Sequence, residues 1–313
     1  IYQQILQTDP NHPEALHLLG VIAYQEGENE RAVDLITKAV NIKPDYPEAH
    51  NNLGNALQDL GEFNEAAANY QKAFDIKPDY AEAHYNLGNA LRDLKRLDEA
   101  ITHYHKATAI QPNYAEAHIN LGAAFQCQGR LEEAVLSHHR ALAIKPDYAE
   151  VHYNLGNALK ELERLDEAIT HYQTAIATQP NYAQAHHNLG DALQGLGKLD
   201  EAVASYHKAL AVKPDYAEVH SNLGVVLHKQ GNLAEAVASY QKAIVVKPDD
   251  AKTHSNLGNT LQELGRLNEA VSSYHKALTI NPNYAEAHNN LGNTLTNLGR
   301  LNEAVSSYHK ALT

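Results

Sequence analysis

Residues 52–78 read NLGNALQDLGEFNEAAANYQKAFDIKP, and closely similar stretches recur along the 313-residue chain at a spacing of 34 residues. A proline marks every copy without a slip in register: Pro10, Pro44, Pro78, Pro112, Pro146, Pro180, Pro214, Pro248 and Pro282. A fixed period of this length is typical of arrays in which each unit packs against its neighbours. The period predicts one elongated array over residues 1–313 rather than separate globular domains.

Each unit has the pattern of two helices. In residues 45–78, one set of apolar residues at helical spacing is Ala49, Leu53, Ala56, Leu57 and Leu60, and a second is Ala66, Tyr70, Ala73 and Ile76. Gly61 separates the two sets and offers a left-handed helix stop, while Pro78 ends the second helix. Small residues such as Gly54 suit the close approach of two helices joined by a short turn. The unit is therefore predicted to be an antiparallel helical hairpin, and the fold class to be all-α.

The start of the first helix carries an expected cap. An Asx residue stands three positions before a Glu, the spacing of a capping box, in Asp79/Glu82, Asn113/Glu116, Asp147/Glu150, Asp215/Glu218 and Asn283/Glu286. Two kinds of departure from the repeat stand out. Lys95 and Glu163 replace the turn glycine, which predicts costlier turns. Residues 247–252 lack both the usual Tyr and the capping Glu, which predicts a softer joint.

The combination Asn-Leu-Gly-x-x-Leu, Gly-x-x-x-Glu-Ala-x-x-x-Tyr-x-x-Ala and Pro resembles the tetratricopeptide repeat (TPR) over essentially the entire chain. The resemblance implies a right-handed superhelical solenoid of helix-turn-helix repeats with a concave groove. Nine first helices are expected, and both ends look cut from a longer chain. The family's frequent Trp on the first helix is His here.

Two columns of asparagine are the candidate protein-binding residues. The first column precedes each Leu-Gly and comprises Asn52, Asn86, Asn120, Asn154, Asn188, Asn222, Asn256 and Asn290. The second lies three residues later and comprises Asn55, Asn89, Asn157, Asn259 and Asn293. The resemblance implies that the first column projects into the groove. An amide can pair with both the C=O and the N–H of an extended peptide. The alternative interpretations are that the copies simply inherited Asn, or that the amide ties adjacent helices together.

Composition argues against several classes of binding partner and bears on the cellular compartment. The formal net charge of −13 and the lack of Lys/Arg clusters argue against nucleic acid and against an anionic membrane. No apolar stretch is long enough to span a bilayer, so membrane insertion is not expected. Cys127 is the only cysteine, which rules out an intrachain disulfide and fits a reducing, cytoplasmic location.

No catalytic, metal or cofactor site is expected. Eight histidines recur in phase: His50, His84, His118, His152, His186, His220, His254 and His288. Equivalent residues lie on successive helices whose axes are about 8 to 10 Å apart, too far for shared ligation of zinc at about 2 Å, so packing roles are favoured. Gly190 to Gly195 has the glycine spacing of a phosphate loop, but Leu196 follows instead of Lys.

The sequence favours a non-catalytic scaffold that holds an extended protein segment. One alternative follows from a second resemblance: the asparagine columns are similar to those in the TPR arm of O-linked N-acetylglucosamine transferases, which implies a substrate-recruiting arm whose catalytic domain lies outside these residues. The other alternative is a structural protein whose array ends stack head to tail.

Overall fold

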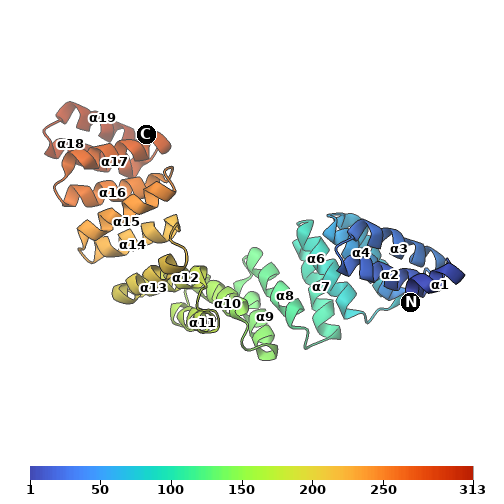
Figure 1. The fold of residues 1–313 in the computed structure, drawn as a ribbon. Coiled ribbons are helices and arrows are strands. Elements are labelled where there is room, and N and C mark those ends of the chain that lie inside the picture. Colours follow the sequence, from blue (N-terminus) through green and yellow to red (C-terminus); the bar gives the residue numbers. More distant parts are fainter. Residues whose placement is uncertain (313) are drawn as a thin grey trace. The chain divides into compact units, whose positions relative to one another are not determined.

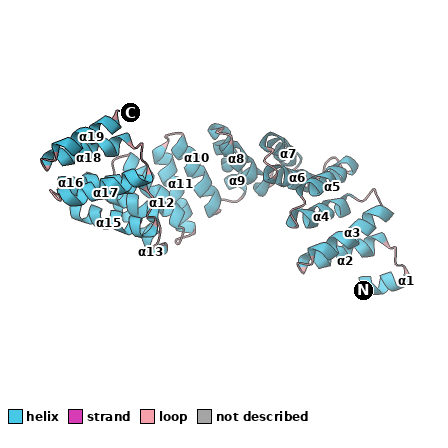
Figure 2. Cartoon of the chain, turned by 90° about the horizontal axis from the view of Figure 1, so that it is seen from above, coloured by secondary structure: helices cyan, strands magenta, loops and turns pink. Residues whose placement is uncertain are grey.

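The computed structural model describes residues 1–312, which form α-helices joined by short loops and contain no strand (Figure 2). The helices are labelled in Figure 1, and their bounds are α1 (Tyr2–Thr8), α2 (Pro13–Gln25), α3 (Asn29–Ile42), α4 (Pro47–Asp59), α5 (Phe63–Ile76), α6 (Ala81–Asp93), α7 (Leu97–Ile110), α8 (Ala115–Cys127), α9 (Leu131–Ile144), α10 (Ala149–Glu161), α11 (Leu165–Thr178), α12 (Ala183–Gly195), α13 (Leu199–Val212), α14 (Ala217–Lys229), α15 (Leu233–Val246), α16 (Ala251–Glu263), α17 (Leu267–Ile280), α18 (Ala285–Asn297) and α19 (Leu301–Ala311). The predicted all-α solenoid of helix-turn-helix units is confirmed.

Within a repeat, the two helices meet through a glycine and a tyrosine. A Cβ added to Gly54 on α4 would lie 2.5 Å from Cε1 of Tyr70 on α5, so only glycine admits the ring. Tyr70 is 1% exposed, and the neighbouring Ala66 and Ala73 are fully buried. Small residues therefore let the two backbones approach while the Tyr70 ring fills the interior of this repeat.

The chain divides into two compact units, one from Ile1 to Ala158 and one from Leu159 onward. In the first unit, α3 packs on α4, α5 on α6 and α7 on α8; in the second, α11 packs on α12, α13 on α14, α15 on α16 and α17 on α18. The second helix of each of these repeats thus packs on the first helix of the next repeat, as in a stacked array. The single array over residues 1–313 stays a prediction.

The turn between the helices of a repeat uses the left-handed region. Gly61 has φ of 82°, and Lys95 and Glu163, which replace glycine at this point, have φ of 64° and 60°. A side chain in this region costs about 1 to 2 kcal/mol relative to glycine. Lys95 and Glu163 thus adopt a left-handed backbone, and its cost in stability stays a prediction.

The predicted capping box is wrong at Asp79/Glu82, Asn113/Glu116, Asp215/Glu218 and Asn283/Glu286. The N-cap of α6 is Tyr80, one residue after Asp79, and its side chain makes no capping hydrogen bond; Tyr114, Tyr182, Tyr216 and Tyr284 occupy the same place. The Asx residue therefore precedes the N-cap, where it cannot complete the reciprocal pair. The one joint expected to lack a cap has one, because Asp250 is the N-cap of α16 and its carboxylate accepts from Lys252 N at 3.2 Å.

Candidate functional site

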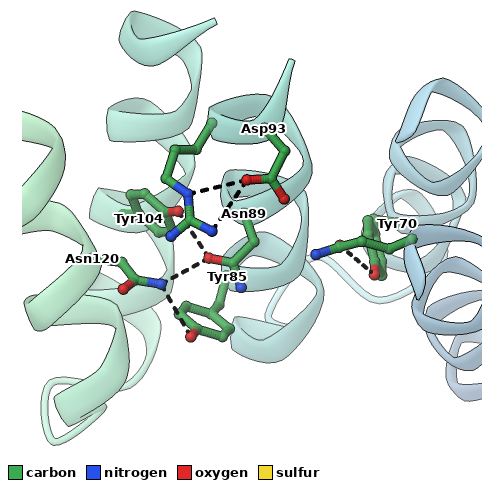
Figure 3. Close-up of polar contacts among 8 residues, drawn as sticks. Tyr70, Tyr85, Asn89, Asp93, Tyr104 and Asn120 are labelled. Carbon is green, nitrogen blue, oxygen red and sulfur yellow. Dashed lines mark hydrogen bonds and ion pairs between the residues drawn. The ribbon is translucent and has the colours of Figure 1, made fainter. Parts of the chain in front are cut away.

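The first asparagine column links most first helices to the first helix of the preceding repeat. The side-chain amide of Asn86 donates to Oδ1 of Asn55 at 3.1 Å and of Asn51 at 3.0 Å. Asn120 donates to Oδ1 of Asn89 at 2.8 Å and to the Tyr85 hydroxyl at 3.1 Å (Figure 3). These amides are half-buried. A structural use of the column, one of the alternatives above, therefore operates at these positions.

The second column is held from the other side by the buried tyrosine of its own repeat. The Tyr104 hydroxyl donates to Asn89 Oδ1 at 2.8 Å, so this oxygen accepts two hydrogen bonds at once (Figure 3). The same tyrosine-to-column bond joins Tyr70 to Asn55, Tyr274 to Asn259 and Tyr308 to Asn293. Asp191 takes the place of Asn in one repeat and accepts from both Tyr206 and Asn222.

This network continues through most repeats. Asn290 donates to Asn259 at 3.0 Å, and Asn52 is bonded to the ring of His17 at 2.9 Å. Asn157 and Asn188 also have interaction partners. Each bond contributes about 0.5 to 1.5 kcal/mol, and a buried polar group left unpaired costs more. The bonded asparagines thus stabilise the joints between repeats.

Two asparagines of the first column depart from this arrangement. Within residues 1–312, the side chains of Asn154 and Asn256 have no hydrogen-bond partner, although both are only half-buried. The reason lies one repeat earlier, where Ala123 and Val225 occupy the second column and offer no oxygen. Asn154 lies in the first compact unit and Asn256 in the second. These two amides are free to bind a ligand.

The recurring histidines hold the loop that leads into each first helix. His118 Nε2 lies 3.0 Å from the carbonyl oxygen of Pro112, six residues earlier. The same contact occurs in His50, His152, His186, His220, His254 and His288. Burial lowers the pKa of His118, which favours its neutral form. The predicted packing role is confirmed, and no group of three metal-ligating side chains occurs among the described residues.

Family models match most of the chain. A model described as TPR repeat matches residues 20–61, 54–94 and 88–129. A second model, described as the C-terminal domain of cilia and flagella-associated protein 70, matches residues 113–313, more than half of the chain. This chain belongs to the tetratricopeptide-repeat family. No curated protein matches it.

Solved structures of other TPR proteins are similar. YrrB, described as a TPR protein with an unusual peptide-binding site, is 26% identical with a TM-score of 0.54 over 59% of this chain and 95% of its own. MamA is 29% identical with a TM-score of 0.51 over 53% and 97%. The Cut9–Hcn1 complex is 19% identical with a TM-score of 0.56 over 85% and 52%, which supports the fold alone.

Two TPR units depart from the rest in their interior: Ile36 packs against Gly20 in the first, and a histidine is found in the other. His138 occupies the place of the buried tyrosine and packs against Gly122, where an added Cβ would lie 2.6 Å from the ring. The ring is 0% exposed, and neither of its nitrogens has a partner. Burial is the main cause that lowers its pKa to about 4. The tyrosine-to-column bond is therefore missing in the same unit that leaves Asn154 unpaired.

The described helices include none that is long and apolar enough to cross a bilayer. Cys127 is exposed at the end of α8. Sequence reasoning placed both asparagine columns but did not separate the bonded amides from the free ones. The signal was available in Ala123 and Val225, which interrupt the second column.

Proposed function

We propose that this TPR chain is a non-catalytic scaffold that binds extended protein segments along the asparagine columns of each compact unit. The observation that carries the proposal is the unpaired state of Asn154 and Asn256. An amide with both a donor and an acceptor available suits the backbone of an extended segment. TPR proteins are typical protein-interaction scaffolds, and YrrB is described as having a peptide-binding site.

The hydrogen-bonded and the unpaired asparagines have different roles. The bonded amides, such as Asn86 and Asn120, fix the joints between repeats, so most of their hydrogen-bonding capacity is used inside the protein. Asn154 and Asn256 contribute to binding instead. The predicted resemblance to the TPR arms of O-linked N-acetylglucosamine transferases likewise implies that the asparagine columns bind protein. A cytoplasmic location remains the expectation.

A displayed library of random ten-residue peptides tests this proposal. Peptides selected on the wild-type chain are titrated against Asn154→Ala and Asn256→Ala, each measured by itself. At least one variant is expected to weaken binding about tenfold, equivalent to about 1.4 kcal/mol, with an unchanged melting temperature. The matched control is Asn86→Ala, which breaks two interior bonds and is expected to lower the melting temperature. Selection of no peptide, or full affinity in both variants, contradicts the proposal.

A further inference from the structure

A cavity of about 380 Å³ opens at one joint of the second compact unit. It lies between α14, the end of α15 and the start of α16, and its lining includes Ser221, Val225, Lys247, Thr253 and Asn256. Asn222 lines it as well, so the cavity adjoins the face that carries the first asparagine column. Its volume is at the lower end of the range for ligand sites, which suits a single side chain.

The cavity exists because one residue of the repeat has changed. Seven joints carry a tyrosine two residues after the proline: Tyr46, Tyr80, Tyr114, Tyr148, Tyr182, Tyr216 and Tyr284. Asp250 replaces it at this joint. The carboxylate folds back onto its own helix, where it accepts hydrogen bonds from Lys252 N at 3.2 Å and Thr253 Oγ1 at 2.6 Å.

The joint one repeat earlier shows how a ring is held. The ring of Tyr216 meets that of His187 edge-on with centroids 5.1 Å apart, and its hydroxyl lies 3.2 Å from His187 Nδ1. Lys213 Nζ stands 4.8 Å from the centre of the Tyr216 ring. A cation at this distance from an aromatic face is attracted to it.

One of the groups that would hold such a ring remains at the open joint, and a hydroxyl replaces the other. Lys247 corresponds to Lys213 and has no ion pair or ring contact among the described residues. Ser221 corresponds to His187, and its hydroxyl contacts that of Thr253 at 2.7 Å. Asn256 adds an unpaired amide at the rim. The cavity therefore offers a cation, a hydroxyl and a backbone-binding amide around an apolar wall that includes Val225.

We infer that this cavity receives a tyrosine side chain of the bound segment, so that a partner supplies the ring that seven other joints take from their own chain. Lys247 stacks on the ring, Ser221 meets the phenol hydroxyl, and Asn256 pairs with the adjoining peptide backbone. Glu218 and Asp250 also line the cavity and offset the two lysines there, so a phosphorylated tyrosine is disfavoured. The part of the inference that concerns the flanking peptide backbone rests on the proposed function. Binding in the cavity itself requires only the tyrosine side chain.

The test is an NMR titration of the full chain with N-acetyl-L-tyrosinamide, which reports on the cavity without a peptide. Saturable shifts of the Asn256 side-chain amide at millimolar ligand are expected, with weaker effects from N-acetyl-L-leucinamide and from the phosphorylated tyrosine derivative. Asp250→Tyr fills the cavity from within and is expected to weaken binding at least tenfold. Asp249→Tyr, at the exposed neighbouring position, is the matched control and is expected to leave binding unchanged.

A second variant keeps the test independent of how well Asp250→Tyr folds. Lys247→Ala removes the stacking cation from an exposed position and is expected to weaken binding at least threefold. Absence of saturable shifts at Asn256, or equal binding by wild type and Asp250→Tyr, overturns the inference. Such a result leaves the library selection intact, so failure of the cavity and failure of the peptide scaffold are distinguished.

Discussion

The joints at Tyr216 and Asp250 are built from the same 34-residue template, one repeat apart, yet one is closed and the other open. At the first, an aromatic ring lies between His187 and Lys213. At the second, an aspartate turns back to cap its own helix and leaves a cavity of about 380 Å³. The difference teaches that substitutions within one repeat template can replace a ring contact with a cavity without altering the helices.

The largest effect is expected when the closed joint is opened. Tyr216→Asp removes a ring that packs on His187 and leaves a cavity, so we expect a loss of about 2 to 4 kcal/mol in the free energy of unfolding. Urea denaturation measures this loss. The variant also tests the comparison directly, because a loss below about 0.5 kcal/mol would show that the ring does not hold the joint.

In the interior of the first unit, His138 is expected to make the folding stability depend on pH, in contrast to the buried tyrosines of other repeats. The pKa of His138 is about 4 when folded, against an ordinary value of 6.5, so the unfolded chain binds the proton more readily. Stability is then lost as the pH falls from about 6.5 toward 4, by about 2 kcal/mol between pH 7 and pH 5.

His138→Tyr should remove this part of the pH dependence, because Tyr does not titrate in that range and finds a buried ring position that its repeat equivalents already use. Denaturation at pH 7 and pH 5 measures it. The control is His139→Tyr, since His139 is exposed. An unchanged difference between the two pH values in His138→Tyr contradicts the assignment to this ring.

Closing the open joint is expected to stabilise the protein by a smaller amount. Asp250→Tyr gains ring packing but loses the cap to Lys252, which is itself worth about 1 kcal/mol, so the net gain should be about 1 kcal/mol. Hydrogen exchange around residues 247–252 should slow in the variant relative to wild type. Faster exchange there would mean that the cap matters more than the missing ring.

The smallest effect concerns a turn outside both joints. Glu163→Gly relieves a non-glycine residue at φ of 60° and should stabilise the protein by about 0.5 to 1 kcal/mol. Thermal unfolding monitored by circular dichroism measures the gain. Gln173→Gly, at an exposed position inside α11, is the control and should destabilise instead.

Much of the fold could be predicted from the sequence because helical spacing, turn glycines and prolines act locally. The turn cost at Lys95 and the packing of the phased histidines followed from the same reasoning. The capping box failed because the helix begins one residue later than the Asx spacing implied, a shift that depends on backbone geometry.

The candidate site was predictable only in part. The asparagine columns could be placed, but their bonding depends on which side chain stands 31 residues earlier on a packed helix, as with Asn86 and Asn55. The loss of Tyr at position 250 was visible, whereas the resulting cavity requires the positions of Asp250 and Lys247 in space.

Exchange of the two joints tests the central claim most directly. In the double variant Tyr216→Asp/Asp250→Tyr, the open joint moves one repeat toward the N-terminus, and N-acetyl-L-tyrosinamide titration followed by NMR locates the ligand. The account predicts that saturable shifts leave the Asn256 side-chain amide and appear at that of Asn188, which corresponds to Asn222 one repeat earlier and does not line the present cavity. Shifts that remain at Asn256 would contradict it.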